Sequence, residues 1–140
     1  MIENKIRHLE MLQSVITRMN SNSFLLKGWT VTIIVALLAF ANTKEMNSKF
    51  IIIGIIPTLI FMFLDCFFLR QERLFRFLYN DVRLSDENFF NFTMDTKKYK
   101  KRKKAKYWRV FFSVTIWTCY IPIVAIILYF YINNFYFSSK

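Results

Sequence analysis

The chain has 140 residues, of which 55% are hydrophobic and 19% aromatic, with only 2 Gly and 2 Pro. A soluble domain of this length could not bury so much apolar surface, so the composition argues against a small soluble globular protein. The net charge of +11 is concentrated between two apolar blocks, a distribution typical of membrane topology rather than of nucleic-acid binding.

Residues 1–22 are predicted to form an amphipathic helix, because apolar residues recur at heptad spacing, as in Ile2, Leu9 and Ile16. Two interpretations stay open. The helix lies on the membrane surface or on the protein's own stalk, or it bundles with copies of itself in an oligomer. The polar run at residues 20–23 predicts a break in the helix, with one of its residues capping the next helix.

Two apolar stretches, residues 24–41 and 50–69, each approach the roughly twenty residues needed to cross a hydrocarbon core of about 30 Å. The short polar stretch between them, residues 42–49, predicts an antiparallel hairpin. Gly54 and Pro57 lie inside the second stretch and predict a bend there, which is either packing geometry or a hinge.

Two ionisable residues lie within this hairpin. Lys27 falls one turn into the first apolar stretch, and Asp65 falls about one turn before the end of the second. In an antiparallel hairpin the two reach a similar depth, and a lone carboxylate at that depth is costly. Either they form an intramembrane ion pair, or Asp65 faces interfacial water near Arg70.

Residues 70–83 continue the second stretch without Gly or Pro, which predicts one long helix over residues 50–83, a membrane span that becomes a cytosolic stalk. Leu74, Leu78 and Val82 line one face of this stalk and are expected to carry its packing.

Beyond the stalk, residues 85–87 predict a helix start, and residues 89–92 are expected to dock this piece onto the stalk or the bilayer interface. The basic segment, residues 97–109, adjoins a third apolar stretch at residues 110–132, which contains Pro122. The segment is interpreted as a topology determinant and a contact for anionic lipids, or else as a site for an anionic ligand such as a nucleotide or RNA. Its nine basic residues are Lys97, Lys98, Lys100, Lys101, Arg102, Lys103, Lys104, Lys106 and Arg109.

The distribution of basic residues predicts the orientation. Residues 70–106 carry twelve Lys and Arg, whereas residues 42–49 carry only Lys44 and Lys49. The positive-inside rule therefore places the N-terminus and residues 70–106 in the cytosol and the C-terminus outside.

The expected fold class is all-α, an integral membrane helical protein with three transmembrane helices. Its expected parts are a cytosolic amphipathic helix (residues 1–22), a transmembrane hairpin (residues 23–69), a cytosolic helical stalk with the polybasic segment (residues 70–106), and a third transmembrane helix with an external C-terminus (residues 107–140).

No catalytic set can be assembled from the sequence. His8 is the only histidine, and there is no zinc-ligand spacing, no Gly-rich phosphate loop and no Ser/His/Asp set. We expect neither an enzyme nor a cofactor or metal. Three spans do not divide into repeats, so a transporter is not expected either.

The stretches SNSFLLKGW at Ser21–Trp29 and LDCFFLRQERLFRFLY at Leu64–Tyr79 resemble those of small bacterial multi-span proteins. The layout is similar to the SLATT-type membrane effectors that accompany nucleotide-signalling antiphage systems. The resemblance implies an oligomeric effector in the inner membrane, which forms a pore or disrupts the bilayer once a cytosolic partner signals.

We therefore expect a homo-oligomeric effector that forms or gates a pore or disrupts the bacterial inner membrane. Its expected partners are anionic membrane lipids, copies of itself and a cytosolic signalling or defence protein. The alternative is a membrane anchor or adaptor that docks a cytosolic protein or a nucleic-acid complex at the membrane.

Overall fold

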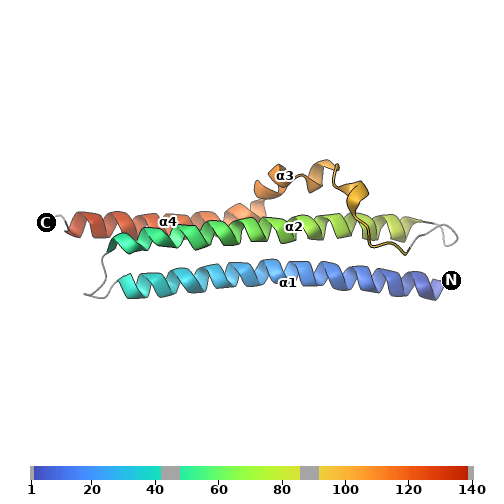
Figure 1. Cartoon of the computed structure of the whole chain (residues 1–140), viewed down its shortest axis with the longest axis horizontal. Coiled ribbons are helices and arrows are strands. Elements are labelled where there is room, and N and C mark those ends of the chain that lie inside the picture. The colour runs from blue at the N-terminus through green and yellow to red at the C-terminus, as the bar shows by residue number, and fades with distance from the viewer. Residues whose placement is uncertain (1, 42–47, 86–91, 139–140) are drawn as a thin grey trace. The chain divides into compact units, whose positions relative to one another are not determined.

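A computed structural model describes residues 2–41, 48–85 and 92–138 (Figure 1). Every regular element in this part of the chain is a helix, so the prediction of an all-α fold is confirmed. The elements are α1 (Ile2–Ala41), the 3₁₀ helix η1 (Ser48–Gly54), α2 (Ile55–Leu84), the 3₁₀ helices η2 (Lys97–Tyr99) and η3 (Lys103–Ala105), α3 (Tyr107–Phe111) and α4 (Val114–Ser138).

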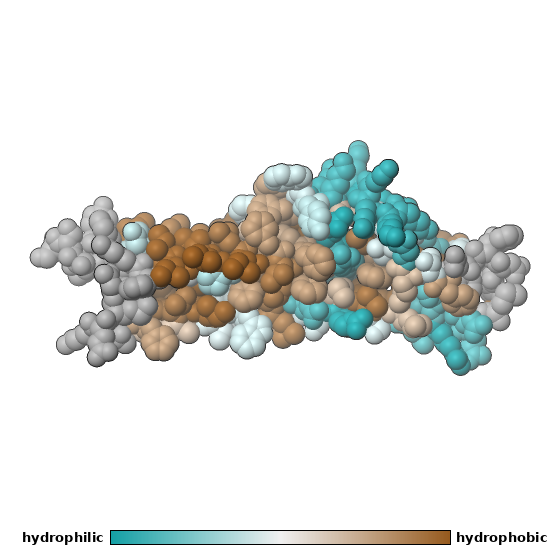
Figure 2. All heavy atoms as spheres, viewed as in Figure 1, coloured by the Kyte–Doolittle hydropathy of each residue, from teal (hydrophilic) through white to brown (hydrophobic). Residues whose placement is uncertain are grey.

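Three of these helices are long and apolar enough to cross a membrane, as the sequence predicted. They cover Ile2–Phe40, Ile51–Leu84 and Val114–Asn133. Figure 2 shows strongly apolar residues over much of the surface, and hydrophilic residues gathered over the segment that contains η2 and η3.

The chain divides into two compact units. The stalk unit comprises residues 1–23 and 66–112, and the apolar unit comprises residues 24–65 and 113–140. Each has its own cluster of buried side chains.

In the stalk unit, the beginning of α1 packs against the stalk part of α2. The stalk residues Leu74, Leu78 and Val82 are buried together with Leu12 of α1. Burying a leucine contributes about 1.5 to 3 kcal/mol, so this cluster is a main source of the unit's stability. Of the interpretations of the N-terminal helix, the structure supports the one in which the helix lies on the protein's own stalk.

In the apolar unit, isoleucines from three elements meet. Ile34 of α1, Ile51 of η1 and Ile127 of α4 are each at most 5% exposed. Gly54, the last residue of η1, lies beside side chains of both α1 and α4. A Cβ atom added at Gly54 would meet the side chain of Ile34 at 3.0 Å.

The predicted helix break at residues 20–23 is wrong, because α1 runs through this region without interruption. Asn and Ser each cost only a few tenths of a kcal/mol in a helix interior relative to good helix formers, and the stretch contains neither Gly nor Pro. Ser23 is only 4% exposed, so it lies on the inner face of the helix rather than in a linker.

The bend predicted inside the second apolar stretch stays a prediction, and the structure places its two residues at a junction between two helices. Residues 50–54 belong to η1, and α2 begins at Ile55, so Pro57 is the third residue of the α-helix. An N–H in the first turn has no partner within the helix, and a proline there costs no hydrogen bond. From Ile55 the helix continues through Arg83, which confirms that the apolar stretch and the stalk share one helix.

The third long helix begins later than predicted, at Val114 rather than Val110. Residues 107–111 form the separate helix α3, and Phe112 and Ser113 separate it from α4. The carbonyl of Ser113 accepts the first hydrogen bond of the new helix, from the N–H of Ile116 at 3.0 Å.

Some expectations fall on residues that lie outside the described part of the chain. These are the hairpin loop at residues 42–47, the helix start at residues 86–87, and residues 89–91 of the docking run. Phe92, the last residue of that run, is described, and its ring meets His8 of α1 edge to face at 5.7 Å.

Candidate functional site

The apolar unit contains a buried ion pair between α1 and α2. Lys27 Nζ lies 2.5 Å from Asp65 Oδ2, and the two side chains are 17% and 0% exposed. The structure thus brings together the two residues that the pairing hypothesis joined. The alternative placed Asp65 in interfacial water near Arg70, but the Asp65 side chain is fully buried, and Arg70 Nε donates to the carbonyl of Ala105 at 2.9 Å.

Two further polar side chains lie beside this ion pair. Thr30, one turn beyond Lys27 on α1, is 1% exposed and donates its hydroxyl to the carbonyl of Leu26 at 2.7 Å. Tyr120 of α4 is 2% exposed, and its hydroxyl lies close to Thr30 and Asp65. Three helices therefore each contribute a polar group to one small cluster in otherwise apolar surroundings.

The ion pair of this cluster holds α1 and α2 together within the apolar unit. Taking two charges out of water is expensive, and their attraction repays the cost only while the geometry is good. Removing either partner leaves an uncompensated buried charge. Relative movement of α1 and α2 within the apolar unit would therefore be resisted until the pair is hydrated or neutralised.

In the stalk unit, a second cluster forms around Asp81 of α2. The phenol of Tyr99, itself 1% exposed, donates to Asp81 Oδ2 at 2.6 Å. Lys98 Nζ lies 3.1 Å and Arg102 Nη2 3.9 Å from the same carboxylate. The Tyr99 hydrogen bond, with help from the two cations, lowers the pKa of Asp81, and burial raises the pKa of Tyr99.

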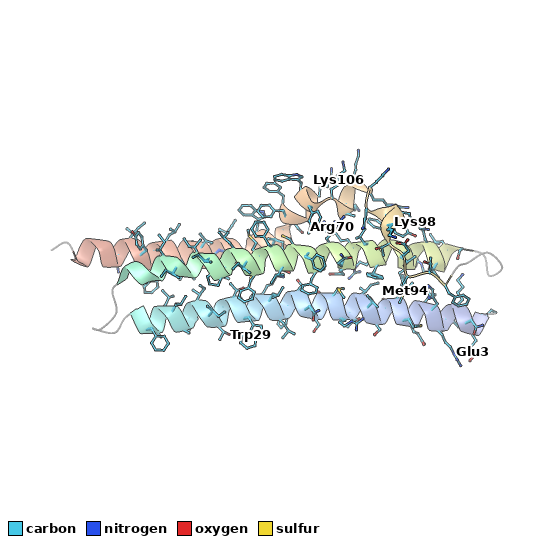
Figure 3. All side chains as sticks on the ribbon, in the orientation of Figure 1. Glu3, Trp29, Arg70, Met94, Lys98 and Lys106 are labelled. Atoms are coloured by element: carbon cyan, nitrogen blue, oxygen red, sulfur yellow. The ribbon has the colours of Figure 1, made fainter. Side chains whose placement is uncertain are left out.

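Two arginines of α2 bind main-chain oxygens of the basic segment. Arg70 donates to Ala105, as noted above, and Arg73 Nη1 donates to the carbonyl of Lys104 at 3.1 Å. The Arg70 guanidinium also lies over the ring of Tyr107, 4.1 Å from its centroid. In Figure 3, Arg70 points from α2 toward the segment that bears Lys106. The basic segment is consequently folded onto the stalk, not extended from it.

From the sequence, the nine basic residues of this segment are interpreted as one contact surface. In the structure, three of them lie close to carboxylates. Lys98 and Arg102 face Asp81, and Lys97 lies 4.0 Å from Asp95. All nine side chains are exposed, and the remaining six are Lys100, Lys101, Lys103, Lys104, Lys106 and Arg109.

Sequence reasoning missed the roles of Asp81 and Tyr99. One signal was available, because Tyr99 is the only residue without positive charge between Lys97 and Lys104. A buried aromatic residue among exposed cations indicates that the segment has an inner face.

The proposed hinge residues Gly54 and Pro57 lie at the junction of η1 and α2, where Gly54 is buried. Within the described residues, no group of three His, Cys, Asp or Glu side chains could hold a metal ion. Comparison with family models, curated proteins and solved structures finds no match to this chain.

Proposed function

We propose that this protein is a homo-oligomeric membrane effector that forms or gates a pore, or disrupts the bacterial inner membrane, in antiphage defence. The observation that carries the proposal is the ion pair of Lys27 and Asp65, buried among helices that are apolar enough to span a membrane. Ionisable residues inside membrane spans are rare and expensive, and they mark functional positions by default.

The exposed apolar surface supports the oligomer. In the most apolar windows of the three long helices, only 17%, 28% and 22% of the residues are buried within one chain. The rest is available to lipid tails or to other copies of the chain. Helices in membranes associate through packing and polar contacts, and copies arranged around an axis are a common solution.

The proposed orientation follows from charge. Twelve basic residues lie in residues 70–106, so this region is assigned to the cytosol, together with the N-terminus. The C-terminus is then external. The proposal also draws on the resemblance of the helix layout to that of SLATT-type effectors.

The proposed mechanism uses the continuity of α2. This helix carries Asp65 of the buried ion pair and also Leu74, Leu78 and Val82 of the stalk. A cytosolic partner that displaces the stalk would apply force to the helix that bears Asp65. Separation of the ion pair would then open the apolar unit to water, which is how a signal in the cytosol would reach the membrane.

Ion leakage is the direct test. The protein is expressed in bacteria under an inducible promoter, and membrane potential is followed with a voltage-sensitive dye. We expect depolarisation soon after induction, and potassium release from vesicles that contain the purified protein. A membrane that stays tight in both assays would overturn the proposal.

The oligomeric state separates this proposal from the adaptor alternative. We expect mass photometry of the protein in nanodiscs to show several copies per particle. A monomer in tight vesicles, isolated with one stoichiometric cytosolic protein, would reject the effector and support the adaptor.

A further inference from the structure

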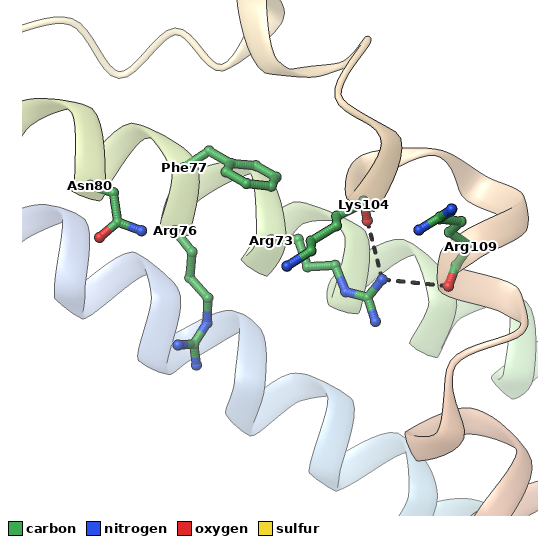
Figure 4. A pocket seen from close by; sticks show the side chains of 6 residues that line it. All are labelled: Arg73, Arg76, Phe77, Asn80, Lys104 and Arg109. Atoms are coloured by element: carbon green, nitrogen blue, oxygen red, sulfur yellow. Dashed lines mark hydrogen bonds between the residues drawn. The ribbon is translucent and has the colours of Figure 1, made fainter.

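A pocket of about 430 Å³ lies in the stalk unit, between α2 and the part of the chain that contains η3 and α3 (Figure 4). Its volume falls within the range of about 300 to 1,000 Å³ that small-molecule sites occupy. Four of its six lining residues are cations, and none of the lining residues among those that the structure describes is a carboxylate. The lining residues are Arg73, Arg76, Phe77, Asn80, Lys104 and Arg109.

Hydrogen bonds from the side chain of Arg73 to main-chain oxygens hold the two walls of this pocket together. Arg73 Nη1 donates to the carbonyls of Lys104 at 3.1 Å and Arg109 at 3.5 Å, as the dashed lines in Figure 4 show. Because these bonds use main-chain oxygens, the side chains of Lys104 and Arg109 are left to meet a ligand, and both are exposed. Arg76 is partly neutralised within α2, because its Nε bonds Glu72 at 2.7 Å.

This arrangement suits a phosphate group. A guanidinium presents a planar fork of donors that matches phosphate oxygens, and a lysine adds a mobile point charge. Arg73, Lys104 and Arg109 are brought to one pocket from three different elements, so a phosphate there would relieve their mutual repulsion. The walls are fixed before the ligand arrives, which lowers the entropic cost of binding.

The surroundings of the pocket indicate where the phosphate comes from. Arg73 lies four residues, or about 6 Å of helix, beyond Leu69, the last residue of the apolar stretch of α2. Trp108 directly precedes Arg109, and Phe112 follows it three residues later. These two side chains are 76% and 62% exposed and stack on each other with ring centroids 6.3 Å apart. Exposed aromatic side chains beside an apolar helix are typical of the headgroup level of a bilayer.

We infer that this pocket binds the phosphate of an anionic phospholipid headgroup. The inference rests on the proposed membrane insertion of the apolar helices. A soluble nucleotide offers the same phosphate chemistry, but the exposed aromatic pair favours the lipid. The proposed site contains only some of the basic residues of the segment. Lys98 and Arg102 contact Asp81 instead, and Arg73 of the stalk is added to the site.

Native mass spectrometry of the full-length protein in detergent tests the site. The protein is incubated with equal amounts of phosphatidylglycerol and phosphatidylcholine, and retained lipid is counted per chain. We expect selective retention of phosphatidylglycerol. The double variant Lys104→Gln/Arg109→Gln should bind phosphatidylglycerol about tenfold more weakly, because two charge-assisted contacts to the phosphate are lost. Both main-chain acceptors of Arg73 remain in this variant.

The matched control removes the same charge elsewhere in the segment. Lys101 and Lys103 are exposed and do not line the pocket, so Lys101→Gln/Lys103→Gln should retain phosphatidylglycerol within about twofold of the parent protein. The exchange Lys104→Arg/Arg109→Lys keeps both charges and should also retain it. Equal loss in both glutamine variants, or equal retention of the two lipids by the parent, would overturn the inference.

A further arm separates the two sources of phosphate. ATP is added to the lipid-free protein, and binding that is lost in Lys104→Gln/Arg109→Gln and resists competition by phosphatidylglycerol would overturn the lipid assignment. Vesicle leakage plays no part in these measurements. Failed lipid retention with preserved leakage therefore rejects the pocket alone, whereas preserved retention without leakage rejects the proposed function alone.

Discussion

The phenol of Tyr99 donates a 2.6 Å hydrogen bond to Asp81 and so fastens the basic segment to the stalk. Tyr99 is 1% exposed, and its ring is stacked on Phe77 of α2, with centroids 6.2 Å apart. The segment carries a dense positive charge that would otherwise favour an extended, solvated chain. One buried tyrosine among lysines, together with the carboxylate that it meets, keeps this charge folded against α2.

Replacing Tyr99 with Phe should loosen the basic segment without unfolding the protein. The ring stays buried, but its hydrogen bond to a charged group is lost, which costs about 1 to 2 kcal/mol. Amide exchange in residues 97–106, followed by mass spectrometry, should become roughly 5 to 30 times faster.

Tyr107→Phe supplies the matched control, because the Tyr107 side chain is 53% exposed and its ring can still lie under Arg70. Unchanged exchange is expected in that variant. If Tyr107→Phe and Tyr99→Phe accelerate exchange equally, the Asp81 contact is not what holds the segment.

The sequence predicted the helices better than it predicted their contacts. The long apolar helices follow from their apolar length, and the continuity of α2 into the stalk follows from the absence of Gly and Pro after Pro57. The predicted break in α1 failed because weak local preferences do not decide a helix that packing supports. Pro57 lies in the first turn of α2, where a proline costs no hydrogen bond.

The contacts of the two candidate sites differ in how well they could be predicted from the sequence. Lys27 and Asp65 could be paired by depth alone, since an antiparallel hairpin brings equal depths together. The contact of Asp81 with Tyr99 joins residues eighteen positions apart, and no local rule specifies a contact at that separation. The pocket depends on which carbonyls Arg73 reaches, and only the three-dimensional structure provides that.

Acid should destabilise the stalk unit through Asp81. Its pKa is lowered in the folded protein, chiefly by the Tyr99 hydrogen bond, so folding favours the ionised form. The stabilisation is fully present above the unfolded-state pKa of about 4 and is lost as pH falls through the lower folded-state pKa. Thermal unfolding of the detergent-solubilised protein, followed from pH 7 to pH 3, should show a falling midpoint below about pH 4.

Asp81→Asn should lower the midpoint at pH 7 and flatten its dependence on acid. The carboxylate is 41% exposed, so we expect a modest change, smaller than that of a fully buried ion pair. A variant whose midpoint falls as steeply as that of the parent protein would assign the acid sensitivity to another carboxylate.

Breaking the ion pair of the apolar unit should be severe, and reversing it should be tolerated. Lys27→Asp places two buried carboxylates side by side, and Asp65→Lys places two buried ammonium groups side by side. Each variant should therefore lose at least about 3 to 5 kcal/mol of folding stability. The double exchange Lys27→Asp/Asp65→Lys restores opposite charges and should recover much of the folded yield in size-exclusion chromatography.

The exposed pair of Glu3 and Arg7 provides the comparison. Their side chains are 75% and 70% exposed, so Glu3→Arg or Arg7→Glu should change the folded yield little. Should the double exchange at Lys27 and Asp65 behave no better than either single change, the pair does not act as a unit.

The chain has two glycines, and we expect opposite effects when a side chain is added to them. At Gly28, inside α1, an added Cβ meets nothing within 4 Å, so Gly28→Ala should raise stability by up to about 1 kcal/mol through helix propensity. At Gly54, a Cβ would lie 3.0 Å from Ile34 and 3.3 Å from Leu37, so a larger side chain must displace both. Gly54→Leu should therefore lower stability by about 1 to 3 kcal/mol. Thermal midpoints of the two variants in the same detergent provide the measurement. A midpoint for Gly54→Leu equal to that of the parent would show that η1 is not held closely against α1 and that the glycine serves chain flexibility instead.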